Sequence, residues 1–179
     1  LACDAADAPR LFAAADRVRA ENVGDAVHLR GLLEFSNICR RDCAYCGLRR
    51  GNAKAERYRL TPDEIVALAC EAEQLGFPSL VMQSGEDAWF TGPRLAEIVR
   101  AIKSRTRLAV TLSVGERDEA DYRLWREAGA DRYLLRIETT DPALFRALHP
   151  DDDLETRKAC LYTLKRLGYQ LGSGVMVGL

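Results

Sequence analysis

The chain has 179 residues, enough to bury a substantial apolar core, and its 26 basic and 27 acidic side chains leave a formal net charge of −1. It has neither the basic excess that favours nucleic acid nor the acidic block typical of a solvating tail. No apolar run approaches the roughly 18 residues of a membrane span, and the first residues lack a secretory signal pattern. We therefore expect a cytoplasmic protein that binds neither nucleic acid nor a membrane.

Short apolar runs alternate with amphipathic helical patterns, after a helical lead-in over residues 1–27. Strands are expected at 28–36, 79–83, 108–113, 132–137 and 170–177. Helices are expected at 9–22, 62–75, 93–104, 117–128 and 154–167, with a short helical turn after Asp141-Pro142. The clearest helix start is Thr61-Pro62-Asp63-Glu64, in which Thr61 is the N-cap and Glu64 closes a capping box.

Strands that alternate with helices predict an α/β fold with a parallel sheet. Three helix ends share one pattern before the next strand, at Leu75-Gly76, Ala128-Gly129 and Leu167-Gly168. A doubly wound sheet and a barrel both satisfy this order, although the first strand lacks the G-x-G-x-x-G of a Rossmann site. We expect one domain over residues 1–179. We also expect the protein to continue past Leu179, because the last apolar run is left uncovered.

Polar residues stand where each expected strand ends, which is the edge of a parallel α/β sheet at which chemistry collects. These are the cysteine-containing loop after strand one, the run 83–87, Thr111 with Ser113, Arg136 with Glu138, and the run 174–178. Because side chains alternate along a strand, Thr111 and Ser113 should share one face, and Arg136 and Glu138 should likewise share one. The opposite face should be apolar and covered by helices.

Three closely spaced cysteines, Cys39, Cys43 and Cys46, form a C-x3-C-x2-C pattern. Six cysteines in a chain of this type favour a metal or catalytic role over disulfides. Three thiolates can hold three irons of a four-iron cluster and leave the fourth iron open to another ligand. The alternative is a structural zinc site, which needs a fourth ligand that His28 and His149 are poorly placed to supply. The other cysteines are expected to be small apolar side chains without a site role: Cys3, Cys70 and Cys160.

The cysteine pattern, with aromatic Tyr45 before the third cysteine, resembles the signature of the radical S-adenosylmethionine (SAM) superfamily. The resemblance implies a TIM-type (β/α) barrel, of which this chain would form about five strands. It also implies that the open iron of a [4Fe-4S] cluster binds SAM and that the reduced cluster cleaves it to a 5′-deoxyadenosyl radical. A reductant such as ferredoxin or flavodoxin would supply the electron.

Longer segments are similar to the HydE type of [FeFe]-hydrogenase maturation enzymes. The segments are 23–31, 34–37, 45–49, 58–61, 83–87, 128–136, 138–139 and 167–169. This resemblance implies a role in assembly of the hydrogenase H-cluster, acting on a small-molecule or iron-complex substrate together with other maturation proteins. Ile137 departs from a pattern in which histidine can stand between the arginine and the glutamate. Two alternatives stay open: a related mutase such as methylornithine synthase, and a non-catalytic iron–sulfur or zinc module.

The resemblance also implies roles for individual residues. Cys39, Cys43 and Cys46 would bind the cluster, and the backbone carbonyl of Tyr45 would lie near the adenine amino group. The loop for the methionine amino group would be Ser84, Gly85, Glu86 and Asp87, with Gln83 before it. The other contacts to SAM would come from Ser113, Glu138, Arg157 and, beside the adenine, Met176. Thr111 and Arg136 would face the substrate.

Residue chemistry alone offers plainer alternatives to several of these roles. Glu86 and Asp87 could be turn residues. A solvated surface position would be the expectation for Arg157 without the resemblance. Arg136 and Glu138 could form a structural ion pair.

Overall fold

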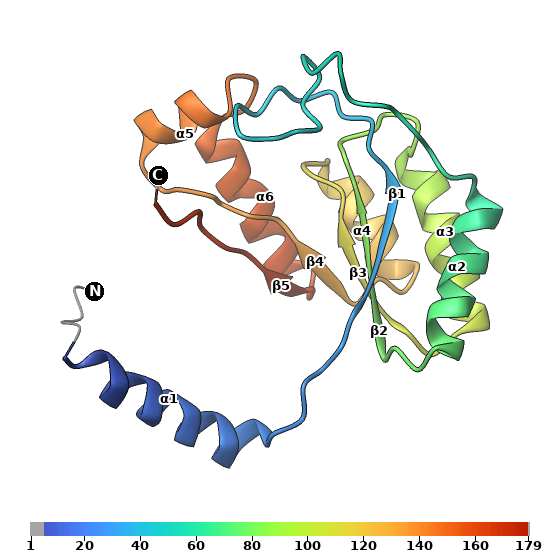
Figure 1. Cartoon of the computed structure of the whole chain (residues 1–179). Helices are drawn as coiled ribbons and strands as arrows, with labels where there is room; N and C mark the ends of the chain where they lie inside the picture. The colour runs from blue at the N-terminus through green and yellow to red at the C-terminus, as the bar shows by residue number, and fades with distance from the viewer. Residues whose placement is uncertain (1–5, 179) are drawn as a thin grey trace.

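Helices and strands alternate along the chain in the computed structural model, which describes residues 6–178 (Figure 1). The helices are α1 (Ala8–Val23), α2 (Pro62–Gln74), α3 (Gly92–Arg105), α4 (Glu119–Glu127), α5 (Pro142–Leu148) and α6 (Leu154–Arg166). The strands are β1 (Gly31–Ser36), β2 (Ser79–Ser84), β3 (Ala109–Ser113), β4 (Arg132–Leu134) and β5 (Gln170–Gly172).

The five strands form one parallel sheet in the order β1-β2-β3-β4-β5, which confirms the expected α/β class. A doubly wound sheet reverses its strand order at a switch point, whereas each strand here pairs with the next one along the chain. Sequential pairing with helical crossovers is the connectivity of a (β/α) barrel wall. The sheet therefore decides between the two architectures that the sequence left open.

The core lies between the sheet and the helices that cover one of its faces. On β3, Val110 and Leu112 are fully buried on that side, as the alternation predicted. An aromatic cluster closes the core beneath β4, with the Tyr133 ring 5.2 Å from that of Tyr122 and 6.3 Å from that of Trp125, measured between centroids. Burial of large aromatic side chains contributes strongly to the stability of such a core.

The local signals at helix ends are confirmed. Thr61 accepts a hydrogen bond from the backbone N–H of Glu64, and the Glu64 carboxylate accepts one from the Thr61 N–H at 2.7 Å, which completes the capping box. The repeated glycines end their helices in the left-handed region, with φ of +87° at Gly76 and +81° at Gly168. These turns direct the chain from each helix into the following strand.

Three strands are shorter than the sequence predicted by three residues or more, and β3 begins one residue late, at Ala109. β1 begins at Gly31 instead of residue 28, because its pairing with β2 starts at Gly31 opposite Leu80. β4 ends at Leu134 instead of 137, and β5 ends at Gly172 instead of 177. Past these ends, within residues 6–178, the pairing of the two segments is reduced to an isolated bridge between Glu138 and Val175 and a few irregular hydrogen bonds. The chain there follows an irregular path that the strict alternation of a strand does not describe.

The lead-in helix α1 buries none of its residues, and Figure 1 shows it apart from the sheet, joined to β1 by an extended segment. Among the residues described, no helix is both long and apolar enough to cross a membrane. Cys70 and Cys160 are partly buried against the core, less deeply than expected. Cys3 lies outside the described residues.

Candidate functional site

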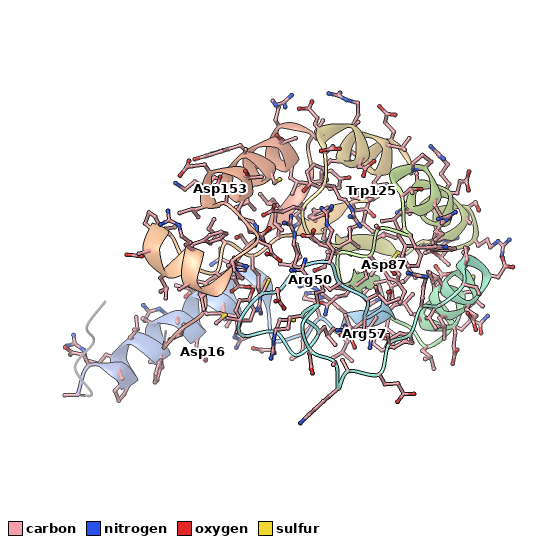
Figure 2. All side chains as sticks on the ribbon, turned by 90° about the horizontal axis from the view of Figure 1, so that it is seen from above. Asp16, Arg50, Arg57, Asp87, Trp125 and Asp153 are labelled. Atoms are coloured by element: carbon pink, nitrogen blue, oxygen red, sulfur yellow. The ribbon has the colours of Figure 1, made fainter. Side chains whose placement is uncertain are left out.

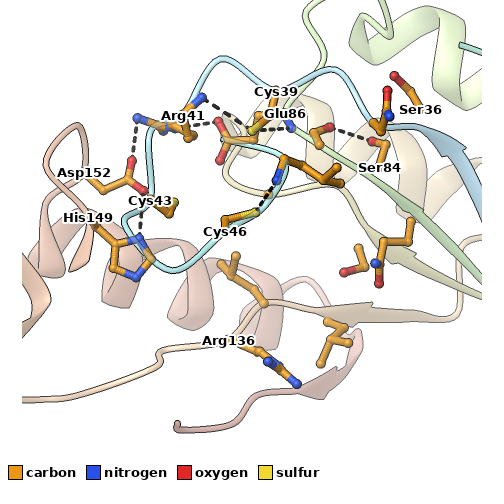
Figure 3. A pocket seen from close by; sticks show the side chains of 18 of the residues that line it. Ser36, Cys39, Arg41, Cys43, Cys46, Ser84, Glu86, Arg136, His149 and Asp152 are labelled. Atoms are coloured by element: carbon orange, nitrogen blue, oxygen red, sulfur yellow. Dashed lines mark hydrogen bonds and ion pairs between the residues drawn. The ribbon is translucent and has the colours of Figure 1, made fainter. Parts of the chain in front are cut away.

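A cavity of about 540 Å³ opens at the carboxyl ends of the strands, where the sequence predicted the site. Most of the predicted site residues line it (Figure 3): Cys39, Cys43, Tyr45, Cys46, Gln83, Ser84, Gly85, Glu86, Ser113, Arg136, Glu138 and Arg157. The lining does not include three others, Asp87, Thr111 and Met176. The rim is therefore built from the ends of β1 to β4 and from the segment between α5 and α6.

The three motif cysteines lie on a loop, residues 37–60, that crosses this end of the sheet. All three are half-buried and unpaired with other cysteines. The Cys39 sulfur accepts hydrogen bonds from the backbone N–H groups of Arg41 and Glu86, each at 3.4 Å, and the Cys46 sulfur accepts one from Leu48 at 3.4 Å. Backbone N–H groups aimed at cysteine sulfurs are typical of iron–sulfur sites, so the donor set fits a cluster held by three thiolates.

Arg57 stabilises the conformation of this loop through hydrogen bonds to its backbone. Its guanidinium donates to the backbone carbonyls of Asn37 at 2.6 Å, Arg49 at 2.8 Å and Leu48 at 2.9 Å. Figure 2, seen from above, shows Arg57 and Arg50 on this loop. A loop without regular structure leaves backbone carbonyls without the partners that a neighbouring strand would provide. The guanidinium of Arg57, with its five N–H donors, supplies these partners instead.

Gly85 brings the β2 loop into contact with the start of the cysteine loop. A Cβ atom at this position would lie 2.3 Å from the carbonyl oxygen of Ile38 and 2.8 Å from the Cβ of Cys39. The Gly85 N–H donates to the Ser36 carbonyl at 3.1 Å, and the Arg40 N–H donates to the Glu86 carbonyl at 3.2 Å. Only glycine permits the two backbones to approach this closely.

A buried network of charges fixes the outer side of the cysteine loop. Arg41 pairs with Glu86 at 2.7 Å, with Glu116 at 3.3 Å and with Asp152 at 2.5 Å. Arg157 pairs with Glu116 and, at 3.1 Å, with Asp152. Burial and the neighbouring Glu116 raise the pKa of Asp152, against the two guanidiniums. Buried carboxylates are tolerated because each has a cationic partner.

Arg157 is therefore not the solvated residue that chemistry alone favoured. Its side chain is only 8% exposed, and its guanidinium also donates to the Arg136 carbonyl at 2.7 Å. It lines the cavity while holding Glu116 and Asp152. A contact from Arg157 to SAM stays a prediction.

The carboxylates of Glu86 and Asp87 are bound within the protein. Glu86 accepts from Arg40, Arg41 and the Glu116 N–H. Asp87 accepts from Arg59 at 2.7 and 2.8 Å, from Ser36 at 2.7 Å and from the Trp89 N–H at 3.0 Å. Burial raises the pKa of Asp87, but the hydrogen bonds from Arg59 and Ser36 outweigh it and leave the pKa below its ordinary value.

Glu138 presents an unsatisfied carboxylate to the cavity. It is 4% exposed, its φ is +59°, and its Oε2 atom has no hydrogen-bond partner among the residues that the structure describes. The other oxygen, Oε1, accepts from the Tyr45 hydroxyl at 3.5 Å and lies 3.8 Å from an Arg136 nitrogen, so the anticipated ion pair is present. Arg136 is mostly exposed, so the two side chains do not share one environment. A buried acceptor without a donor indicates a place for a ligand hydroxyl or amine.

The remaining predicted residues differ in their access to the cavity. Gln83 donates to the Glu34 carboxylate at 3.1 Å, and Ser113 lines the cavity from the end of β3. Thr111 is 9% exposed within the sheet, below the rim. The Met176 N–H donates to the Glu138 carbonyl at 3.0 Å, which places its backbone beside Glu138.

Comparison with known proteins agrees with this geometry. The Radical SAM superfamily profile matches residues 33–179. The chain belongs to the radical SAM superfamily. Members of this superfamily use a [4Fe-4S] cluster and SAM, the pair of cofactors that the resemblance of the cysteine motif implied.

Radical SAM relatives of two kinds stand out in sequence. The chain is 53% identical over 169 residues to the [FeFe] hydrogenase maturase subunit HydE of Thermotoga maritima, covering 94% of this chain and 48% of that protein. It is 31% identical over 171 residues to 3-methylornithine synthase of Methanosarcina barkeri, covering 94% of this chain and 49% of that protein. The chain thus spans about half the length of these relatives.

Radical SAM crystal structures share the fold. Methylornithine synthase (PylB) superposes with a TM-score of 0.90 at 30% identity, covering 98% of this chain and 52% of that one. HydG, a maturase of the [FeFe]-hydrogenase, superposes with a TM-score of 0.88 at 22% identity, covering 98% and 41%. These superpositions confirm that the five-stranded sheet corresponds to part of a TIM-type barrel. Because both enzymes fit closely, the fold itself does not separate their activities.

Sequence reasoning missed four residues of this radical SAM site: Arg41, Glu116, His149 and Asp152. Arg41 lies inside the cysteine motif, and its two charged neighbours in sequence gave no reason to single it out. His149 seemed too distant in sequence to join the cysteines, yet α5 brings it beside Cys43. One signal was available, because the acidic run Asp151-Asp152-Asp153 precedes α6 in the connection from α5.

His149 is buried beside the cysteine loop. It is 1% exposed, its ring stacks on Phe145 at 4.5 Å between centroids, and it meets the Tyr45 ring edge-on at 5.4 Å. Burial, reinforced by Arg157 and Arg41, lowers the pKa of His149 to about 4. Burial also raises the pKa of Cys43 to about 12, with Asp152 and the other two thiols adding to it, so this cysteine is a thiol in the metal-free site.

Proposed function

We propose that the chain is the core domain of a HydE-type radical SAM enzyme that cleaves SAM reductively and assists assembly of the [FeFe]-hydrogenase H-cluster. The observation that carries the proposal is the cavity that Cys39, Cys43 and Cys46 line together with Glu138, whose buried Oε2 atom has no hydrogen-bond partner among the described residues. The 53% identity to a HydE subunit supports this choice over the synthase, whose identity is 31%.

In this proposal the three cysteines hold the cluster, and the rest of the rim binds SAM. When bound, the cluster and SAM supply an electron and a carbon–sulfur bond that can break to give a carbon radical. Ser84 and Gly85 present backbone groups to the methionine amino group, with Gln83, Glu86 and Asp87 fixing their loop. Glu138 accepts from ribose hydroxyls, and the adenine lies against Tyr45 and Met176.

Arg157 and Ser113 would complete the SAM site, and Arg157 would do so by releasing one of its carboxylate partners to bind the methionine carboxylate. Arg136, whose side chain is largely exposed, would attract an anionic group of the substrate, with Thr111 beneath the same wall. The substrate would be a small molecule or an iron complex. A ferredoxin or flavodoxin would reduce the cluster, and other maturation proteins would act with the enzyme in the cytoplasm.

The experiment is anaerobic reconstitution of the protein with iron and sulfide, followed by incubation with SAM and dithionite. We expect iron and sulfide to bind and 5′-deoxyadenosine to form. Zinc without iron would refute the enzyme and favour a structural metal site. Production of methylornithine from lysine would assign the synthase reaction instead. Restoration of hydrogenase activity in a host that lacks its HydE-type maturase would support the maturase assignment.

A matched pair of cysteine variants tests the ligand assignment. Cys43→Ala should lose the spectrum of the four-iron cluster and release no 5′-deoxyadenosine. Cys70→Ala removes a half-buried thiol from α2, away from the cavity, and should keep both. Equal loss in the two variants would count against the cysteine loop as the cluster site.

A further inference from the structure

The three motif cysteines differ in what surrounds their sulfur atoms. Two backbone N–H groups donate to Cys39 and one donates to Cys46. Within residues 6–178, no hydrogen bond of this kind reaches the sulfur of Cys43. Hydrogen bonds to cysteine sulfurs stabilise the extra electron of a reduced iron–sulfur cluster and so raise its reduction potential. Cys43 is therefore the sulfur that still needs a donor.

The ring of His149 could supply such a donor. Both ring nitrogens are buried without a hydrogen-bond partner in the part of the chain that the structure describes. One ring nitrogen lies within 4.8 Å of both the Cys43 sulfur and a carboxylate oxygen of Asp152, and Figure 3 shows the three side chains side by side. The ring cannot turn away easily, because Phe145 stacks on it. The backbone of His149 is also fixed, since its N–H donates to the Phe145 carbonyl at the end of α5.

The Asp152 carboxylate does not accept a hydrogen bond from the ring of His149. Its nearest oxygen is 3.7 Å from Nδ1, which is beyond hydrogen-bond distance, and the carboxylate is paired with Arg41 and Arg157. Those two guanidiniums also make the group of Cys43, His149 and Asp152 a poor site for a separate metal cation.

We propose that His149 donates a ring N–H hydrogen bond to the sulfur of Cys43 when that sulfur is a cluster ligand, and thereby raises the reduction potential of the cluster. This inference rests on the proposed binding of a cluster by Cys39, Cys43 and Cys46. Neutral or protonated, imidazole carries at least one N–H, so the role does not depend on its charge. His149 is a positioning residue that acts through Cys43 and does not touch SAM.

The first test compares midpoint potentials of the cluster by redox titration followed by electron paramagnetic resonance. His149→Phe keeps an aromatic ring but removes the donor, and we expect the one-electron reduction to become about tenfold less favourable, a shift of about −59 mV. His149→Gln restores an N–H donor and should recover part of the shift. The control is His28→Phe, which removes the other histidine at an exposed position. A potential in His149→Phe equal to that of the control would overturn the inference.

The second test needs no change at His149. In His28→Phe protein labelled with ¹⁵N-histidine, His149 carries the only labelled ring, since the chain has two histidines. Pulsed electron paramagnetic resonance of the reduced cluster should detect a weak ¹⁵N coupling transmitted through the hydrogen bond. Absence of this coupling, or a strong coupling from nitrogen bound directly to iron, would overturn the proposed donor. Failure to form any cluster signal would instead overturn the proposed function.

Discussion

Gly85→Ala should displace the cysteine loop, because the added methyl group would meet backbone and not a flexible side chain. The new Cβ would lie 2.3 Å from the Ile38 carbonyl oxygen and 2.8 Å from the Cys39 Cβ, far inside ordinary contact distance. Overpacking against atoms that cannot move independently typically costs about 1–3 kcal/mol. For a chain of this size that corresponds to a fall in Tm of roughly 3–9 °C. Displacing Cys39 should also reduce iron loading.

The matched control is Gly47→Ala, next to Cys46 on the same loop. A Cβ at Gly47 would meet nothing within 4 Å, and its φ is not in the left-handed region. We expect its stability to stay within about 0.5 kcal/mol of the parent and its iron content to be unchanged. Thermal unfolding and iron analysis of both variants decide the matter. If Gly85→Ala melted and loaded iron like Gly47→Ala, the close approach of the two loops would not be what positions Cys39.

Three further changes have defined outcomes. Asp87→Asn should lower stability by about 1–3 kcal/mol at neutral pH, since it weakens the pair with Arg59, and urea titrations should show the gap closing as pH falls below about 5 and through the lowered pKa of Asp87. The sign follows because the pKa of Asp87 is lowered in the folded state, so its contribution is lost when acid protonates it. Glu138→Gln should keep the iron content but weaken SAM binding about tenfold or more by calorimetry; unchanged affinity would argue against a ribose contact. Trp125→Phe removes the hydrogen bond to the Gly92 carbonyl at 2.8 Å and part of a fully buried ring, so chemical denaturation should report a loss of about 1–3 kcal/mol.

The regular elements were predictable because their signals are local. The capping box at Thr61 and the junction glycine Gly76 specify where α2 begins and ends without reference to the rest of the molecule. Strand ends were predicted less well, since a strand extends only as far as its neighbour pairs with it. Apolar residues past Leu134 and Gly172 fitted a strand pattern, but the pairing stops there and the chain leaves the regular sheet.

The site was predictable to the extent that residues sit at strand ends. The alternation of side chains along a strand correctly predicted that Ser113 lines the cavity and Leu112 lies in the core, because β3 is regular up to its last residue. The same alternation put Arg136 and Glu138 on one side, and both line the cavity and pair at 3.8 Å, although Glu138 is buried at a positive φ and Arg136 is mostly exposed. Arg157 and His149 could not be assigned from residue chemistry, because Arg157 is buried against Glu116 and His149 against Tyr45, which lie on other segments.

The arrangement of charges explains how the cysteine loop can be held in place and yet leave its sulfurs accessible. Arg41 joins Glu86 and Asp152, which follow two different strands of the sheet. The loop is thus fixed by ion pairs, while the hydrogen bonds that reach the sulfurs of Cys39 and Cys46 within residues 6–178 come from backbone N–H groups. Carboxylates near a cluster would repel its negative charge if they were unpaired, but guanidiniums neutralise them here. Near Cys43 the same pairing matters most, because burial and Asp152 both disfavour a negative charge on this sulfur and Arg157 opposes them.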